Sequence, residues 1–421
     1  MYRTDRQFAR EMDAQDGLAA YRQQFHCPRG TDGRPVIYLC GNSLGLQPIG
    51  VRQAVLDELD KWADFGVEGH FARPYPWYSY HEHLCAAAAA IVGALEHEVV
   101  AMNSLTTNLH LMMVSFYRPT ATRYKILIEA TAFPSDQYAV ASQAKFHGFD
   151  PKDAVVVLSP RDGESTLRTE DIEAYLDVHG QEVALVMFGG VNYYTGQAFD
   201  MASITAAGHR NGCIVGFDLA HAAGNLMLEL HDWGVDFAVW CSYKYLNAGP
   251  GGVGGCFVHD RHAAAVDLPR FAGWWGTDPA TRFQMDPAFV PQHGAEGWQL
   301  SNAMILPMAA LRASLELFEA AGMPALRQKA LALTEYLLFL IDQIPSESFE
   351  IITPREPAAR GCQISIRALS NGRALFERLE QGGVVCDFRE PDVIRVAPVP
   401  LYNSFEDVWS FWSILKESVS S

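Results

Sequence analysis

The chain has 421 residues, of which 49% are hydrophobic, 19% are charged and 11% are aromatic. This composition excludes a disordered, collagen-like or repeat protein and is typical of a globular protein with a large core. Single cores stop growing at about 250 to 300 residues, so the length predicts one large domain and one smaller one. The formal net charge of −17 argues against nucleic acid or anionic lipid as a partner.

The cysteines and the apolar stretches favour a cytoplasmic protein. The eight cysteines are scattered without a C-x-x-C pair, which predicts reduced, mostly buried thiols rather than disulfides or a metal site. The polar N-terminal segment lacks the apolar region of a secretory signal. The longest nearly apolar stretch, residues 84–95, is shorter than the roughly 20 residues of a membrane-spanning helix. We therefore expect no membrane partner.

The first two-thirds of the chain predict an α/β domain. The first twenty-odd residues predict a polar amphipathic helix, followed by a short buried strand at 36–40 and a helix from Pro48 through residue 65. From about residue 80 to residue 270, helices alternate with short, almost wholly apolar strands. These strands lie at residues 125–130, 154–158, 184–188, 213–218 and 237–242. Such a pattern predicts a mainly parallel sheet covered on both faces.

The last third of the chain has a different order of predicted helices and strands. Two long helical patterns, at 304–321 and 325–344, precede short strands and two further helices. The strands are expected at 349–353, 362–366, 383–387 and 393–397, and the helices near residues 374 and 405. This order predicts a smaller α+β domain. We expect an N-terminal segment, 1–50, that packs with the small domain, a large domain at 51–300 and the small domain at 301–421.

Two glycine motifs match signatures that their surroundings do not support. GNSLG at residues 41–45 fits the G-x-S-x-G nucleophile elbow, but only one short strand precedes Ser43, whereas an elbow follows several strands. GPGGVG at residues 249–254 fits the dinucleotide signature G-x-G-x-x-G, but a strand rather than a helix is predicted after it. We expect a tight turn at the first motif and a close backbone approach at the second.

The histidines do not predict a metal site. His81 and His83 are two residues apart and point in different directions on a helix, so we expect a solvated helix start there. The other histidines considered have no companion at ligand spacing and are expected in surface or structural roles. They are His97, His179, His209, His231, His259 and His262.

Asp218 and Lys244 form the strongest candidate site. Each follows an apolar strand, and ligand sites of parallel sheets collect at these strand ends. A lysine among apolar neighbours is costly unless it is paired or used chemically. Pyridoxal phosphate needs a lysine for a Schiff base and a carboxylate facing the pyridinium nitrogen, and these two residues fit both needs. A capping aspartate and a lysine that reaches solvent are the alternatives at this point.

The chain resembles the kynureninase family, pyridoxal-phosphate hydrolases of the aspartate aminotransferase fold, also called fold type I. This resemblance implies a sheet of the seven-stranded type in the large domain. The matching blocks span nearly the whole chain, and several are long and chemically unusual. They are YLCGNSLGLQP (38–48), MNSLTTNLHLM (102–112), AFPSDQYA (132–139), RDGE (161–164), YYTGQ (193–197), GFDLAHAAGN (216–225), LHDWGVDFAVWCSYKYLNAGPGG (230–252), GWWG (273–276), QLSN (299–302) and IRVAPVPLYNSF (394–405).

The resemblance implies hydrolysis of the Cβ–Cγ bond of L-kynurenine or 3-hydroxykynurenine, which gives anthranilate or 3-hydroxyanthranilate and L-alanine. Such a reaction belongs to tryptophan degradation or NAD biosynthesis. The resemblance further implies that Lys244 holds the cofactor and moves the α-proton, and that Asp218 keeps the cofactor ring able to accept electrons. It also implies that Tyr243 contacts the phosphate and transfers protons.

The remaining cofactor contacts follow from the same resemblance. Phe133 is expected to stack on the ring, with Ser135 and Asp136 at its polar edge, and His221 to support Asp218 or the ring edge. Leu105 and Thr106, at a helix start, are expected to bind the phosphate.

The resemblance also implies a substrate pocket shared between two subunits. Arg395 is the candidate for the substrate α-carboxylate, assisted by Asn42. His70, Trp274 and Asn302 resemble aryl-pocket residues, and Trp274 and Asn302 are expected to reach the cofactor site of a neighbouring subunit in a homodimer. Because His70 and Asn302 can both hydrogen-bond a ring hydroxyl, we expect a preference for 3-hydroxykynurenine.

One departure and several competing functions remain. Gly189 stands where some family members carry a small hydroxyl side chain, so one polar contact is absent or replaced. Another fold type I activity, such as that of a cysteine desulfurase or an aminotransferase, is possible on the Asp218 and Lys244 frame. A serine hydrolase using Ser43 and a catalytically silent dimer are alternatives from other classes.

Overall fold

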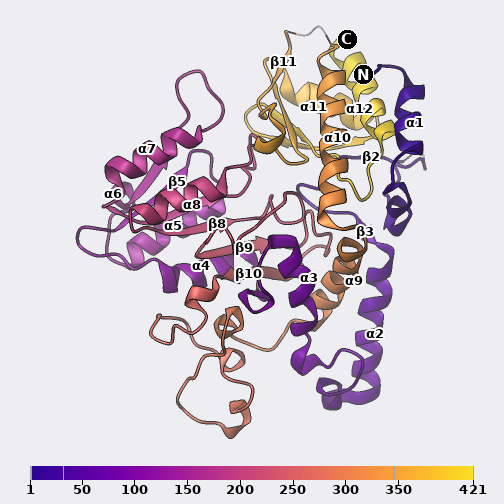
Figure 1. Cartoon of the computed structure of the whole chain (residues 1–421). Helices are drawn as coiled ribbons and strands as arrows, with labels where there is room; N and C mark the ends of the chain where they lie inside the picture. The colour runs from indigo at the N-terminus through magenta and orange to yellow at the C-terminus, as the bar shows by residue number, and fades with distance from the viewer. Residues whose placement is uncertain (1, 32, 345–346, 421) are drawn as a thin grey trace.

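A seven-stranded sheet forms the centre of the computed structural model, which describes residues 2–31, 33–344 and 347–420 (Figure 1). The strand order is β4-β10-β9-β8-β7-β5-β6. The neighbouring strands from β9 to β6 are parallel, and β10 is antiparallel to both β9 and β4. The bounds are β4 Val99–Ala101, β5 Lys125–Glu129, β6 Val155–Leu158, β7 Val183–Gly189, β8 Ile214–Asp218, β9 Phe237–Cys241 and β10 Gly254–Val258. The predicted mainly parallel α/β sheet is confirmed.

Helices bury both faces of this sheet. Side chains of a strand alternate between faces, and β5 shows the result: Ile126 and Ile128 join one apolar cluster, whereas Leu127 joins another. The first cluster includes residues of α4 and α5, and the second includes residues of α3, α7 and α8. The helix bounds are α3 Glu82–Val92, α4 Leu105–Phe116, α5 Pro134–Phe146, α6 Pro151–Ala154, α7 Thr169–His179 and α8 Met201–Arg210.

The strand β6 is the exception to double coverage. It lies at the sheet edge and pairs only with β5, and the side chain of Val157 is 52% exposed. The expectation that all five apolar strands are buried on both faces is therefore wrong for this strand, because an apolar run does not reveal its place in the strand order.

A smaller sheet organises the C-terminal part, in the order β11-β12-β15-β14 (Figure 1). Its strands are β11 Phe349–Ile351, β12 Ile364–Ala368, β14 Asp387–Arg389 and β15 Val393–Val396, and its neighbouring helices include α10 Met323–Ile341, α11 Gly372–Gln381 and α12 Phe405–Ser420. The helix α9, Ile305–Ala321, packs on α3 and on α2, Ile49–Phe65. The sequence did not predict β14, whose residues Asp387 and Arg389 are charged.

The N-terminal segment packs against this C-terminal part. Strand β2, Ile37–Tyr38, pairs in parallel with β13, Val384–Val385, and α1, Arg6–Ala14, packs on α12. The first helix ends at Ala14 and a separate 3-10 helix covers Ala19–Gln24, so the single helix predicted over this stretch is wrong. Gly17 lies between the two pieces, and glycine disfavours a continuous helix. The division of the chain at residues 50 and 300 stays a prediction.

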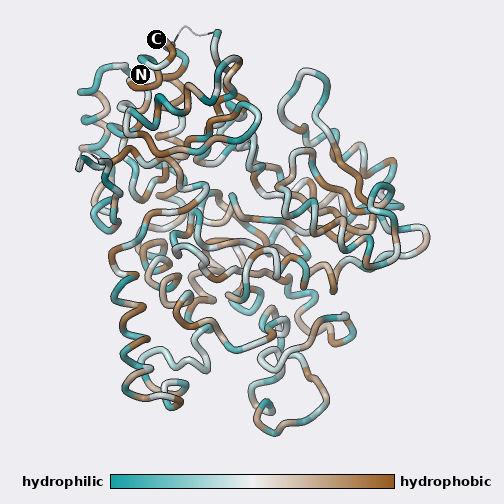
Figure 2. The backbone as a smooth tube through the Cα atoms, turned by 180° about the vertical axis from the view of Figure 1, so that it is seen from behind, coloured by the Kyte–Doolittle hydropathy of each residue, from teal (hydrophilic) through white to brown (hydrophobic). Residues whose placement is uncertain are grey.

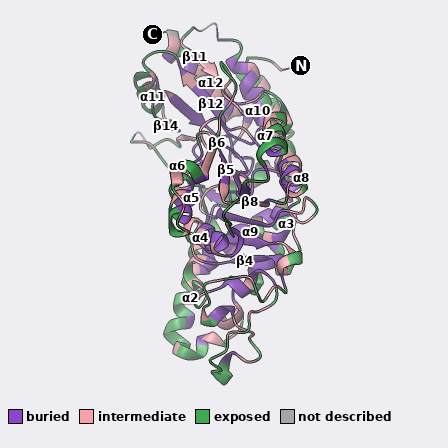
Figure 3. Cartoon of the chain, turned by 90° about the vertical axis from the view of Figure 1, so that its left-hand side faces the viewer, coloured by how far each residue is buried: buried purple, intermediate pink, exposed green. Residues whose placement is uncertain are grey.

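Hydrophobic stretches run through the strands of both sheets, and hydrophilic stretches lie mostly on the outer loops (Figure 2). The helix α2, Ile49–Phe65, was predicted from the apolar pattern after Pro48. Its C-terminal end projects from the body of the molecule and is exposed (Figure 3). Within the described residues, no helix is both long and apolar enough to cross a membrane.

Candidate active site

The ends of three adjacent parallel strands meet at one small cavity. Glu129 ends β5, Gly189 ends β7 and Asp218 ends β8, and Gly189 pairs directly with Asp218 in the sheet. The cavity measures about 80 Å³ and also takes residues that follow β9. Its lining residues are Leu105, Thr106, Glu129, Phe133, Ser135, Asp136, Gly189, Val191, Tyr193, Asp218, Ala220, His221, Tyr243 and Lys244. A ligand site at the carboxyl ends of parallel strands is the usual arrangement in such sheets.

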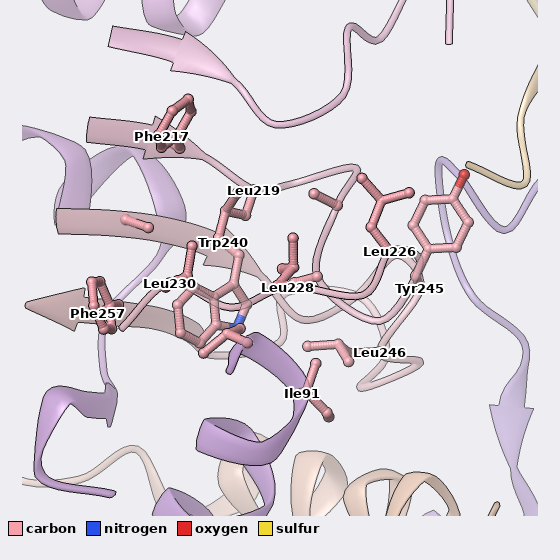
Figure 4. Packing of buried hydrophobic residues seen from close by; sticks show 14 of the residues in the cluster. Ile91, Phe217, Leu219, Leu226, Leu228, Leu230, Trp240, Tyr245, Leu246 and Phe257 are labelled. Carbon is pink, nitrogen blue, oxygen red and sulfur yellow. The ribbon is translucent and has the colours of Figure 1, made fainter. Parts of the chain in front are cut away.

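An apolar cluster below the cavity fixes its two central residues. Phe217 and Leu219 flank Asp218 and point into this cluster together with Trp240 (Figure 4). Because side chains alternate along a strand, Asp218 points away from the cluster. Tyr245, which follows Lys244, is anchored in the same cluster (Figure 4). Asp218 is thus held by packed neighbours on either side, and Lys244 by the packed Tyr245 that follows it.

The carboxyl groups in the cavity differ in charge because their surroundings differ. Burial raises the pKa of Asp218, but the nearby Lys244 charge and the N–H of Ala220, 2.7 Å from Oδ1, oppose that rise. Burial and the charge of Asp218 raise the pKa of Asp136 well above its usual value. The hydrogen bond between the two side chains raises the pKa of Asp136 and lowers that of Asp218, so Asp136 donates this bond and Asp218 accepts it.

His221 lies next to the lysine. Its Nε2 is 3.1 Å from Lys244 Nζ, and burial followed by the charge of Lys244 lowers the pKa of His221 well below its usual value. The imidazole is therefore neutral and accepts a hydrogen bond from the lysine ammonium. The expected support of Asp218 by His221 stays a prediction, since the side-chain partner of the imidazole is Lys244. The contact of His221 with the edge of a bound ring stays a prediction.

One end of the cavity suits an anion and its side suits a flat ring. Leu105 and Thr106 begin α4, and Ser104 before them does not cap the helix with its side chain, so backbone N–H groups of the first turn face the cavity end. Thr106 Oγ1 and Ser135 Oγ are 2.9 Å apart and add hydroxyl groups there. The ring of Phe133 is 43% exposed, and Lys244 Nζ lies 5.9 Å from its centre.

Arg395 and Asn42 lie next to the cavity without lining it. Arg395 is 1% exposed and its Nη1 donates to the carbonyl oxygen of Tyr193, a lining residue, at 2.8 Å. Asn42 is fully buried; its Nδ2 donates to Gln363 Oε1 at 3.3 Å, and its Oδ1 has no hydrogen-bond partner among the described residues. Both predicted substrate residues thus lie where the small sheet meets the cavity.

His70, Trp274 and Asn302 are not part of this cavity. A chain of ring contacts joins the first two on one surface: Phe71 next to His70 stacks on Tyr78 at 6.0 Å, Tyr78 stacks on Phe283 at 5.8 Å, and Phe283 meets Trp274 edge-on at 5.6 Å. Trp274 is 44% exposed, and Asn302 is exposed as well.

Known proteins match the whole chain. A family model described as the kynureninase C-terminal domain matches residues 326–415. A kynureninase of Myxococcus xanthus is 60% identical over 416 residues, 99% of this chain and 98% of that one, and one of Koribacter versatilis is 60% identical over 408 residues, 97% and 96% of the two chains. The chain belongs to the kynureninase family.

Solved structures confirm the fold of this kynureninase family member. A variant of the cystine C–S lyase C-DES with glycine linked to its pyridoxal phosphate superposes with a TM-score of 0.78 at 19% identity, over 94% of this chain and 99% of that one. A cysteine desulfurase of Escherichia coli gives 0.76 at 16% identity, over 96% and 98%. The predicted fold type I architecture is confirmed, and so is the predicted family.

Sequence reasoning missed Glu129, which lines the cavity of this kynureninase family member. It is fully buried, and burial raises its pKa to about 7 despite a hydrogen bond from the N–H of Gly189 at 3.2 Å. A Cβ at Gly189 would stand 3.0 Å from Glu129 Oε1, so this glycine leaves room for the carboxyl group. The signal was available, since Glu129 ends an apolar strand just as Asp218 does.

The geometry disfavours two of the alternatives, a serine hydrolase and a cysteine desulfurase. Ser43 Oγ hydrogen-bonds Asp387 and also accepts from Arg395 Nη2 at 3.0 Å, and no histidine is among its hydrogen-bond partners in the described part of the chain. A serine nucleophile needs a base such as histidine at this position. Seven of the eight cysteines are buried and Cys27 is partly buried, so none offers the exposed thiol of a desulfurase. The loop at 249–254 leads into β10, as the sequence predicted.

The expectation of a solvated helix start is wrong for His81, whereas the structural role expected of His231 and His259 agrees with their contacts. His81 is only 2% exposed and lies 3.3 Å from Glu296, because α3 begins against the segment around residue 296 rather than in solvent. His231 and His259 gather around the buried Glu98 with ligand atoms within 4.8 Å of one another. The oxygen Oε1 of Glu98 already accepts from His231 at 2.9 Å and from the N–H of Asp260 at 2.7 Å, so these groups form a satisfied hydrogen-bond network.

Proposed function

We propose that this chain hydrolyses the Cβ–Cγ bond of L-kynurenine or 3-hydroxykynurenine to L-alanine and the corresponding anthranilate, as an enzyme of tryptophan breakdown or NAD synthesis in the cytoplasm. The observation that carries the proposal is that Lys244 and the carboxyl group of Asp218 line the same cavity at the strand ends of a fold type I sheet. The family supports the substrate, since relatives at 60% identity are named kynureninase. The net charge of −17 does not support nucleic acid as a partner.

Pyridoxal phosphate is the cofactor, and the cavity fits it. Asp218 would face the pyridinium nitrogen, the flat face of Phe133 would cover the ring, and the start of α4 would bind the phosphate. The side-chain oxygen Oε2 of Glu129 and the Nδ1 of His221 are buried without partners among the described residues, as expected where a polar ligand completes the site. When bound, the cofactor supplies an electron sink for the carbanion formed at the substrate.

Two residues of this chain, Lys244 and Tyr243, would transfer protons. Lys244 would take the α-proton of the substrate, and the neutral His221 at 3.1 Å would keep the lysine nitrogen oriented. Burial raises the pKa of Tyr243 well above its usual value, so its hydroxyl keeps its proton and is suited to donate it to the leaving group. Arg395 and Asn42 would hold the substrate α-carboxylate from the side of the small sheet.

A homodimer would complete this site. Large apolar side chains are exposed over the end of α2 and the 260–306 region, the surface that carries His70, Trp274 and Asn302. They include Trp62, Phe65, Val67, Phe71, Phe271, Phe283 and Met285. Such a patch is typical of an interface between copies. Trp274 and Asn302 would thereby reach the cofactor site of the partner subunit, and His70 and Asn302 would favour the hydroxylated substrate by hydrogen-bonding its ring hydroxyl.

The visible absorption spectrum and product assays test the cofactor and the reaction together. Purified protein is expected to show a visible band that is lost in Lys244→Ala, and to release alanine from both substrates, faster from 3-hydroxykynurenine. In Ser43→Ala the reaction is expected to persist, since Ser43 is not a nucleophile here. A colourless protein that stays inactive with added pyridoxal phosphate, or a Ser43→Ala variant without any turnover, would contradict the proposal.

Subunit mixing tests the shared site and its specificity. Lys244→Ala and Trp274→Ala are each expected to be inactive, but coexpressed chains should regain part of the activity, because one site of a mixed dimer is then intact. No recovery in verified mixed dimers would contradict the contribution of Trp274 from the partner. The double change His70→Trp with Asn302→Thr is expected to erode the preference for 3-hydroxykynurenine, and an unchanged ratio of kcat/KM values would refute that role.

A further inference from the structure

Asp387 and Arg395 face each other across the antiparallel strands β14 and β15 of the small sheet. Arg395 Nε donates to Asp387 Oδ1 at 2.6 Å, and its Nη2 donates to Asp387 Oδ2. Two parallel hydrogen bonds between a guanidinium and a carboxylate fix the plane of the guanidinium as well as its position. The side chain of Arg395 is 1% exposed, so solvent does not compete for this pair.

The remaining N–H groups of Arg395 are almost fully used. Nη1 donates to the carbonyl oxygen of Tyr193 at 2.8 Å and Nη2 donates to Ser43 Oγ at 3.0 Å. A guanidinium has five N–H groups, so one N–H on Nη1 has no partner among the described residues. A carboxylate ligand can form a two-pronged contact only at the Nη1 and Nη2 end, where it takes the place of the Ser43 hydroxyl. Asp387 keeps the opposite edge of Arg395 occupied throughout.

The net charge of Asp387, Arg389 and Arg395 together is suited to binding one carboxylate. Arg389 Nη2 lies 3.2 Å from Asp387 Oδ2, so Asp387 sits between two guanidinium groups. Burial raises the pKa of Asp387, but the hydrogen bonds and charge of Arg395 outweigh this effect and hold that pKa below its usual value. Asp387 is therefore ionised at neutral pH, and the two arginines with Asp387 carry one net positive charge.

We propose that Asp387 is a positioning residue that holds the Arg395 guanidinium in the plane required to receive the substrate α-carboxylate. The proposal rests on the proposed role of Arg395. Asp387 itself does not touch the substrate and acts only through Arg395. Without it the guanidinium keeps its charge but loses the two bonds that orient it, and a misplacement of about 1 Å in a binding group can cost about a hundredfold in efficiency.

Steady-state kinetics of the Asp387→Asn holoenzyme test this proposal. We expect the KM for L-kynurenine to rise by about tenfold or more while kcat changes by less than about threefold, because binding common to ground state and transition state is lost. The visible spectrum and the affinity for pyridoxal phosphate are expected to stay unchanged. Asp392→Asn is the matched control, since Asp392 lies in the same hairpin and accepts a hydrogen bond from Tyr194 at 2.8 Å.

Arg395→Gln separates the failure of this inference from the failure of the proposed function. If Arg395→Gln raises KM and Asp387→Asn does not, Asp387 has no positioning role, although Arg395 binds the carboxylate. If neither raises KM, both assignments are wrong. Equal losses in kcat, cofactor affinity and thermal stability would mark Asp387 as merely structural. Should Asp387→Asn not fold, Asp387→Glu keeps the charge but displaces the two-pronged contact, and a wild-type KM in that variant would equally overturn the proposal.

Discussion

Gly45 touches the backbone of the catalytic loop, and its replacement by alanine should displace Lys244. Its N–H donates to the carbonyl oxygen of Tyr243 at 2.9 Å. A Cβ at Gly45 would stand 2.9 Å from Asn247 Cα and closer still to the carbonyl oxygen of Lys244. Carbon atoms pack at about 3.5 to 4.0 Å, so the segment from Lys244 to Asn247 has to move by about 1 Å. Such an insertion into a packed site costs about 1–3 kcal/mol of stability.

The consequence for catalysis is larger than the consequence for stability. A displacement of about 1 Å in the lysine is expected to lower kcat by about a hundredfold and to weaken cofactor binding. The assay compares kcat, cofactor affinity by visible titration, and the melting temperature of Gly45→Ala with those of Gly17→Ala. Gly17 has open space around its Cβ position, so its change should be silent. If the two variants behave alike, the contact of Gly45 does not position Lys244 and the reasoning is refuted.

Three further predictions concern two buried carboxyl groups and the ring of Phe133. The pKa of the Glu129 carboxyl is raised from 4.5 to about 7, so the folded protein binds this proton more tightly than the unfolded chain does. Its contribution to the free energy of unfolding therefore falls as the pH rises from about 4.5 to about 7. Urea unfolding of Glu129→Gln at several pH values should lack this decline. Asp236 accepts hydrogen bonds from His209 at 2.9 Å and from His262 at 2.8 Å. Asp236→Ala should lower the free energy of unfolding by about 3 kcal/mol. A smaller loss would count against a stabilising role of these two hydrogen bonds. Phe133→Ala should weaken pyridoxal phosphate binding by about tenfold in a spectroscopic titration of apoenzyme, and unchanged affinity would rule out ring stacking.

The strands that carry the site were predictable from the sequence because each is a short apolar run with a polar residue at its end. Asp218 and Lys244 follow such runs, and the fold brings them together as expected. Glu129 obeys the same rule and was overlooked, since its role depends on lying beside Gly189 and Asp218, and this adjacency is set by the strand order. Position at the sheet edge, as for β6, is hidden for the same reason.

Contacts between distant segments were the least predictable part of the site. The sequence suggested Arg395 for a carboxylate, but nothing local revealed that Asp387 and Ser43 already bind it. β14 has only one apolar residue between two charged ones, so hydrophobic periodicity did not detect it. The aromatic surface near His70 was equally hidden, since Phe71, Tyr78 and Phe283 come from three separate segments and meet only in the folded chain.

The pairing of β2 with β13 has a consequence for folding during synthesis on the ribosome. Ile37 and Tyr38 emerge early, whereas their partners Val384 and Val385 are made near the end of synthesis. Throughout elongation the N-terminal segment therefore stays without its partner, although the central sheet between them can already form. Arg395, which lies in β15, is also made late, so a chain that stalls before β15 can hold the residues of the cofactor site and yet lack the arginine proposed to bind the substrate.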